Sequence, residues 1–345
     1  MDIGLLTFCA AKPGESQEEC YAATFNEIVC ADETGWDAVW TGGVPLRGNV
    51  SHPLLMAAAI AGRTRRIRIG TAVHLPHLRA PGERFTTDVP GGASTIDRRG
   101  PAGEAYRYVL EHMLPADPLQ IAEQIAMIDQ VSEGRFVYGA GGNTIGDARR
   151  RSHFFEFLEV MKQAWSEEHF SGFQGEFYEY PALPAGSGVM PKPVQKPYPP
   201  ILLPLDSQQS FGPMGRMGYR IAIGGGSSHN ERGDAVLRED VRQYRQAWED
   251  AGHPGDAKVV IRISTYVAAT QAEANRAMGT ASTAERRHGT DLFGTPGEVV
   301  ERIHQLRTDF GADEIMCTML SRSLSREDVL RSIRLIAEDV ILRIP

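Results

Sequence analysis

Hydrophobic residues along the chain fall into two recurring patterns, apolar residues at helical spacing and short β-rich runs. A helical pattern ends near a glycine, and a strand-like run follows within a few residues, at Gly35, Gly134, Gly218 and Gly311, with a variant at Gly62. Glycine suits such a helix end because it enters the left-handed conformation without a Cβ clash. Junctions of this kind along the whole chain predict alternating strands and helices with a parallel sheet.

The β-rich runs number eight and have helical patterns between them. One helix is predicted from a capping box that joins Thr295 and Glu298, and another from apolar residues at helical spacing between Leu119 and Ile128. Eight strand–helix units predict an α/β fold, the (β/α)8 TIM barrel, with a doubly wound open sheet as the alternative. The expected strands are 3–8, 38–40, 67–73, 136–139, 201–203, 220–223, 259–267 and 314–318.

Two long segments interrupt the alternation. Residues 78–116 follow the third strand and include a helix-like stretch at 104–113, and residues 170–200 precede the fifth strand and are rich in aromatic residues and proline. Loops of this length are usually functional lids or disordered. We expect one domain over residues 1–345, with 78–116 as an insertion that covers the active site.

Charge and cysteine content exclude several classes of protein. The chain has 36 Lys and Arg against 44 Asp and Glu, a net charge of −8, which argues against nucleic acid or an anionic membrane as the main partner. Its four cysteines form no CxxC pair, so reduced thiols in or near a core are expected. Because neither a signal peptide nor an apolar stretch of membrane-spanning length is visible, we expect a cytoplasmic protein.

Glycines gather where predicted strands end. They occur at 42–43, at 139–142 and at 224–226, and in a β/α barrel the carboxyl ends of the strands carry the active site. Backbone without side chains allows a large flat ligand to approach closely. The three glycine clusters on one rim favour the interpretation that such a ligand binds there. The alternative is that these glycines only serve tight turns.

The segment 201–215 runs from a buried strand into a helix that is expected to begin near Ser207. Ser207, Gln209 and Ser210 would offer hydrogen-bond donors at that helix start, where an anion such as phosphate is favoured. Ordinary capping by Asp206 or Ser207 explains the same residues equally well. The residues alone therefore indicate a barrel that binds a flat, phosphate-bearing cofactor.

Histidines give a weaker signal. His74 and His77 follow the third strand, but no carboxylate at metal-site spacing accompanies them, and strand geometry directs them to opposite faces. We expect no metal site. His74 is a candidate pocket residue or proton donor, with a structural histidine as the alternative, and His52 is expected at a helix start.

The chain resembles the bacterial luciferase-like monooxygenases, which are flavin-dependent barrels. Five stretches in register carry this resemblance and cover nearly all of the chain except the segment 82–116. They are GWDAVWT (35–41), HPLLMAAAIAGRTRRIRIGTAV (52–73), DPLQIAEQIAMIDQVSEGRFVYGAGG (117–142), PKPVQKPYPPILL (191–203) and GTPGEVVERI (294–303).

The resemblance implies specific site residues. In the family, the strand-three motif often has a non-proline cis peptide under the flavin ring, which matches the bond between Ala72 and Val73. The remaining expected flavin contacts are Gly142 and Asn143 after the fourth strand and the phosphate-binding residues Asp206, Ser207, Gln209 and Ser210. Substrate or lid contacts are expected from Phe8, His77, Tyr106, Tyr108 and Met113.

The resemblance also implies an activity. FMN, reduced by a partner NAD(P)H:flavin reductase, reacts with O2 in this family to give a C4a-hydroperoxyflavin that oxygenates a small organic substrate. Family members commonly form homodimers. Two other functions stay open, a deazaflavin-dependent oxidoreductase on the same barrel and a non-catalytic flavin-binding protein.

The chain departs from luciferase itself at two places. An acidic residue followed by two histidines after strand two is replaced by Gly42, Gly43 and Val44, and a cysteine and an arginine after strand four align with Gly141 and Gly142. These changes remove the catalytic histidine and one phosphate-binding arginine of luciferase, so light emission from a long-chain aldehyde is not expected.

Overall fold

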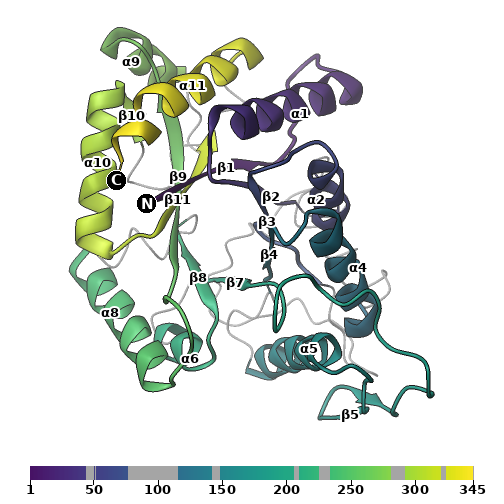
Figure 1. Ribbon diagram of the computed structural model, residues 1–345. Helices are drawn as coiled ribbons and strands as arrows, with labels where there is room; N and C mark the ends of the chain where they lie inside the picture. Colours follow the sequence, from purple (N-terminus) through teal and green to yellow (C-terminus); the bar gives the residue numbers. More distant parts are fainter. Residues whose placement is uncertain are drawn as a thin grey trace.

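Eight parallel strands close into a barrel in the computed structural model of the protein (Figure 1). The order around the barrel is β1, β2, β3, β4, β7, β8, β9 and β11, and the ring is closed because β9 pairs with both β8 and β11 while β11 also pairs with β1. This closure confirms the TIM barrel and excludes the open sheet. The barrel strands are Asp2–Thr7 (β1), Ala38–Thr41 (β2), Arg68–Thr71 (β3), Phe136–Gly139 (β4), Ile201–Pro204 (β7), Arg220–Ile223 (β8), Val259–Val267 (β9) and Glu314–Met319 (β11).

The structure describes most of the chain but not all of it. The described residues are 1–43, 50, 52–76, 116–141, 148–205, 210–224, 234–280, 292–319 and 324–344. Most of the predicted insertion 78–116, including its helix-like stretch 104–113, lies outside them. No helix among the described residues has the length and apolar character needed to cross a membrane.

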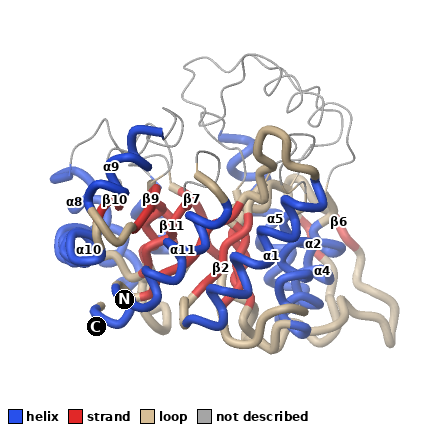
Figure 2. Tube along the Cα trace, turned by 90° about the horizontal axis from the view of Figure 1, so that it is seen from above, coloured by secondary structure: helices blue, strands red, loops and turns tan. Residues whose placement is uncertain are grey.

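Helices surround the strands, and both termini lie side by side at the amino end of the barrel (Figures 1 and 2). The capping box of Thr295 and Glu298 is formed as predicted, and Gly311 ends the same helix in the left-handed conformation. The helices are Gln17–Thr34 (α1), Pro53–Ala61 (α2), Pro118–Val131 (α4), Ala148–Ser166 (α5), Phe211–Arg216 (α6), Asp234–Asp250 (α8), Gln271–Thr280 (α9), Pro296–Phe310 (α10) and Arg326–Asp339 (α11), followed by the 3-10 turn Ile341–Arg343 (η2).

Three short strands were not predicted. β10 (Leu292–Gly294) pairs with the end of β9, outside the ring. β5 (Phe173–Gln174) and β6 (Glu179–Tyr180) form an antiparallel hairpin within the segment 170–200. The Glu156 carboxylate on α5 accepts hydrogen bonds from three successive backbone N–H groups of the hairpin turn, at 2.7 to 2.9 Å, and so holds this segment on the barrel.

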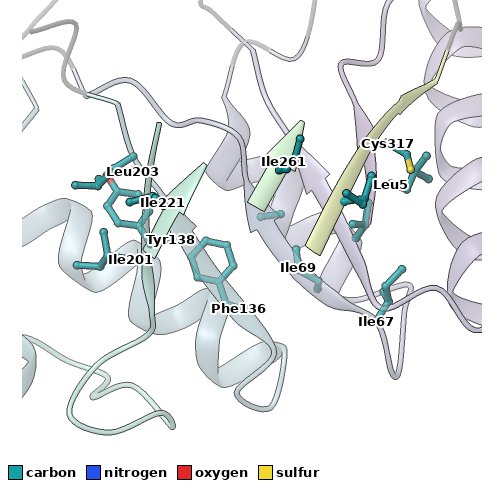
Figure 3. Packing of buried hydrophobic residues seen from close by; sticks show 14 of the residues in the cluster. Leu5, Ile67, Ile69, Phe136, Tyr138, Ile201, Leu203, Ile221, Ile261 and Cys317 are labelled. Atoms are coloured by element: carbon teal, nitrogen blue, oxygen red, sulfur yellow. The ribbon is translucent and has the colours of Figure 1, made fainter. Parts of the chain in front are cut away.

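Side chains alternate between two cores along each barrel strand. The outer core lies between strands and helices, and Figure 3 shows part of it, including Ile69, Phe136 and Ile201. The inner core fills the barrel, as expected for inward-facing positions of a closed sheet. It consists of Leu6, Ala38, Trp40, Val137, Leu202, Val260 and Met316. All four cysteines are buried and free, which agrees with the sequence-based expectation of reduced thiols.

A polar cluster closes the amino end of the barrel below this inner core. Glu314 accepts a hydrogen bond from the Trp40 indole N–H at 2.6 Å and pairs with Arg68 at 3.1 Å, and Arg68 also pairs with Asp2 at 2.9 Å. Burial raises the pKa of Glu314 to about 7 even though Arg68 lies beside it. With this end filled, a ligand can reach the inward-facing side chains of the described strands from the carboxyl end of the barrel.

The raised pKa of Glu314 predicts a pH dependence of stability. Its carboxyl would titrate near 4.5 in the unfolded chain and near 7 in the folded protein, so the free energy of unfolding falls as the pH rises between these values. We expect Glu314→Gln to remove this fall. Between pH 5 and pH 8, the variant should gain up to about 3 kcal/mol relative to the wild type in urea unfolding.

The exposed carboxylate Glu301 on α10 provides the control, since Glu301→Gln should leave the pH dependence unchanged. Parallel pH profiles for the wild type and Glu314→Gln would contradict the prediction, because they would mean that Glu314 has the same pKa in both states.

Candidate functional site

Inward-facing side chains become accessible at the carboxyl end of the barrel. The inner core is buried throughout, but on six of the eight strands the next inward position is half-buried or, at Pro204, exposed. We call six of these residues the barrel-mouth floor. They are Phe8, Ala72, Pro204, Ala222, Arg262 and Thr318. Phe8, Ala72 and Ala222 pack directly on the inner core, so the floor is a rigid, largely apolar surface.

The backbone at the end of β3 is fixed between both neighbouring strands. The bond between Ala72 and Val73 is a cis peptide, as predicted. Ala72 N–H donates to the Thr41 carbonyl of β2 at 2.8 Å, and His74 N–H donates to the Gly139 carbonyl of β4 at 2.8 Å. The Thr71 hydroxyl adds a bond of 2.7 Å to the same Gly139 carbonyl. The cis peptide is therefore held in place from two sides.

Two rim glycines permit this close packing. A Cβ atom at Gly42 would lie 2.2 Å from the Ala72 carbonyl oxygen, and one at Gly139 would lie 1.6 Å from the Thr71 carbonyl oxygen. Both distances are far below van der Waals contact, so only glycine fits. The interpretation that these glycines leave bare backbone for a ligand is wrong for Gly42 and Gly139, because a neighbouring strand occupies that space.

Arg262 is the one cation of the barrel-mouth floor. Its Nε donates to the Thr318 hydroxyl at 3.2 Å, and its guanidinium carbon lies 5.2 Å from the centroid of the Phe8 ring. Among the described residues, no carboxylate forms an ion pair with it. Burial lowers the pKa of Arg262 to about 10, so the side chain stays charged at neutral pH. The floor therefore combines an apolar surface with an uncompensated positive charge.

Arg262 was not predicted as a site residue from the sequence, although a signal was present. It lies in the middle of the apolar run 259–267, where Arg262 and Ser264 share the face that turns into the barrel. A charged residue on a strand that is otherwise buried on both faces needs a partner or a function.

His74 lies on the other side of the sheet from the barrel-mouth floor. Its Nδ1 is 3.0 Å from the Tyr138 hydroxyl, and Tyr138 belongs to the outer core, where burial raises its pKa. His74 lines a groove of about 500 Å³ between α2 and α4, together with Leu55 and Met127. The structure thus separates His74 from Phe8 and Ala72, which the sequence had grouped with it. His52 precedes α2, as predicted.

Several predicted site residues lie outside the described part of the chain. The described helix α6 begins at Phe211, and Ser210, directly before it, makes no side-chain capping bond, whereas the expected helix start near Ser207 lies outside the described residues. The flavin-contact candidates Gly142, Asn143, Asp206, Ser207 and Gln209 and the substrate or lid candidates His77, Tyr106, Tyr108 and Met113 are not described. Within the described ranges, no three His, Cys, Asp or Glu side chains are grouped to hold a metal ion.

The barrel-mouth floor fits a flavin by its chemistry. Phe8, Ala72 and Ala222 offer an accessible apolar surface to a flat aromatic ring. Arg262 offers a cation that no carboxylate of the described residues neutralises, which suits a ligand with negative charge.

Comparisons with known proteins point to one family. The profile of the luciferase-like monooxygenases matches residues 1–83 and 112–293, and its gap falls within the predicted insertion. An uncharacterized protein of Mycobacterium bovis is 28% identical over 179 residues, which cover 49% of this chain and 58% of that protein, and two Mycobacterium tuberculosis strains have proteins with the same match. This chain therefore spans little more than half the length of these relatives.

Solved structures share the fold. A monooxygenase from Streptomyces bottropensis has a TM-score of 0.77 at 23% identity over 99% of both chains. The oxygenating constituent of 3,6-diketocamphane monooxygenase from Pseudomonas putida, in complex with FMN, has a TM-score of 0.73 at 18% identity, over 100% of this chain and 99% of that one. An F420-dependent secondary alcohol dehydrogenase has a TM-score of 0.68 at 14% identity over 98% of both chains. From the extent of the profile match, the chain belongs to the luciferase-like monooxygenase family.

Proposed function

We propose that the protein is the oxygenating component of a two-component monooxygenase that uses reduced FMN and O2 to oxygenate a small organic substrate. The observation that carries this proposal is the barrel-mouth floor, an accessible apolar surface beside the cis peptide of Ala72 and Val73 in a barrel of this family. A partner NAD(P)H:flavin reductase would supply the reduced FMN. The related FMN complex of a diketocamphane monooxygenase supports FMN as the cofactor.

Different residues would bind the flavin and shield it from water. Reduced FMN, when bound, supplies the electrons that activate O2. Phe8, Ala72 and Val73 would support the flat ring, and the apolar floor would keep water away from it. From the family resemblance, Gly142 and Asn143 would contact the flavin, and Asp206, Ser207, Gln209 and Ser210 would form the phosphate site. His74, the candidate proton donor, faces away from this floor and would instead anchor the segment after the cis peptide through its contact with Tyr138.

A deazaflavin-dependent oxidoreductase is the second candidate function. The likeness to an F420-dependent secondary alcohol dehydrogenase favours it, because that enzyme shares the barrel over nearly the whole chain. The two functions differ in their need for O2. Turnover only with deazaflavin, without O2 consumption, would identify the second.

The first prediction of this proposal concerns cofactor binding and O2. Anaerobic titration with FMN reduced by dithionite should show saturable binding, because the floor offers both an apolar surface and a cation. Mixing this complex with O2 and a panel of ketones and aromatic compounds should couple O2 consumption to an oxygenated product. Binding of neither form of FMN would contradict the proposal, and binding without turnover of FMN or deazaflavin would indicate a non-catalytic flavin-binding protein.

The second prediction concerns the close packing beside the cis peptide. A methyl group at Gly42 must displace the Ala72 carbonyl, so Gly42→Ala should weaken reduced-FMN binding at least tenfold and lower the free energy of unfolding by about 1–3 kcal/mol. The matched control is Gly297→Ala in α10, where a Cβ atom meets nothing within 4 Å. That variant should bind FMN as the wild type does. Unchanged affinity in Gly42→Ala would place the ring away from this peptide.

We also propose a homodimer formed through α2 and α4. Leu55, Met127 and Val131 are three of the seven exposed large hydrophobic residues among those described, and they lie on these two helices beside the groove that His74 lines. Apolar side chains gathered on one face usually mark an interaction surface. A second copy of the chain would cover both the groove and these side chains.

Leu55→Glu tests the dimer. Leu55 is 70% exposed, so the variant should fold normally but shift the protein from dimer to monomer in sedimentation velocity, because a carboxylate would be buried in the interface. Leu342→Glu, at a site 81% exposed on η2, is the control and should stay dimeric. A monomeric wild type, or an unchanged dimer in Leu55→Glu, would refute this interface.

A further inference from the structure

Arg262 has hydrogen-bonding capacity that the described structure does not use. A guanidinium carries five N–H donors in a planar fork. In the described part of the chain, Nε bonds to the Thr318 hydroxyl and the plane approaches the Phe8 ring, while neither Nη atom donates to a carboxylate. The residue is half-buried at the carboxyl end of the barrel, so a ligand can reach it.

Among the residues that the structure describes, no charge elsewhere in the barrel compensates Arg262. The carboxylate of Glu314 on the neighbouring strand β11 is engaged with Arg68 and Trp40 at the amino end. The apolar side chains of Val260 and Met316 lie between Glu314 at the amino end and Arg262 at the carboxyl end of the barrel. A cation that is largely withdrawn from water and lacks a counter-charge is costly, and such groups are concentrated at functional sites.

A chain of contacts links Arg262 to the cis peptide. Its guanidinium lies against the Phe8 ring, an edge of Phe8 lies 3.1 Å from the position of a Cβ atom at Gly42, and Gly42 abuts the Ala72 carbonyl. A flat ring that covers Phe8 and Ala72 is therefore adjacent to Arg262. The oxidised flavin ring is neutral, whereas two-electron reduction leaves an anionic N1–C2 carbonyl edge, which the guanidinium fork matches with two donors.

We infer that Arg262 binds the anionic edge of the reduced flavin ring and so makes the protein prefer reduced over oxidised FMN. This inference rests on the proposed flavin-dependent function. Arg262 would act on the cofactor before any substrate is present. The preference would let the protein take reduced FMN from a reductase and release oxidised FMN after turnover.

Arg262→Gln tests the inference by comparing the two redox states of the same ligand. Anaerobic dissociation constants should show reduced FMN bound at least tenfold more weakly than by the wild type, with oxidised FMN changed less than threefold. For a two-electron couple, a tenfold rise in the ratio of the dissociation constant of reduced FMN to that of oxidised FMN lowers the midpoint potential of bound FMN by about 30 mV. Spectroelectrochemistry measures this potential independently. Arg262→Lys keeps the charge but loses the planar fork, so its affinity for reduced FMN should lie between those of the wild type and Arg262→Gln. This variant replaces Arg262→Gln in the test if Arg262→Gln does not fold.

Arg220→Gln is the matched control, because Arg220 is also a half-buried arginine on an inward-facing position, but at the amino end of the barrel. It should leave the ratio of the two dissociation constants unchanged. Equally weakened binding of reduced and oxidised FMN in Arg262→Gln would overturn the inference. So would an unchanged ratio accompanied by loss of benzoate binding to the FMN complex, which would assign Arg262 to a substrate carboxylate. If the wild type binds neither form of FMN, the proposed function itself fails.

Discussion

Backbone packing at the end of β3 is the constraint on which the site depends. Thr41 of β2 and Gly139 of β4 each bind the backbone that flanks the cis peptide, and the Thr71 hydroxyl ties β3 to β4 as well. This arrangement requires the strand ends to approach more closely than any side chain allows, which explains Gly42 and Gly139. Because the peptide is held by the barrel itself, its position does not depend on the long loops around it.

The barrel interior is organised along its axis by charge. Glu314, Arg68 and Asp2 satisfy one another at the amino end, where Trp40 also donates to Glu314. An apolar layer follows, and then Arg262 with only a hydroxyl and an aromatic ring beside it in the described structure. The amino-end cluster is satisfied internally and serves stability, whereas no described residue supplies a counter-charge at the carboxyl end.

Sequence patterns could predict the fold because its determinants are local. The eight barrel strands and the capping box at Thr295 agree with what the sequence patterns predict, and the cis peptide at Ala72 and Val73 agrees with what the family resemblance implies. The hairpin of β5 and β6 could not be predicted because its turn is held by Glu156, a residue of a preceding helix. Features that depend on contacts between neighbouring strands could not be predicted from the sequence either. The direction of His74, the packing role of Gly42 and the isolation of Arg262 all depend on which strand lies alongside.

We propose that the barrel-mouth floor binds a flavin ring beside the cis peptide. A crystal structure of the protein soaked with FMN tests this claim most directly. We expect electron density for the ring over Phe8 and the peptide of Ala72 and Val73, with Arg262 at its edge and the phosphate near Ser210. Density for FMN at any other place, such as the groove between α2 and α4, would contradict it.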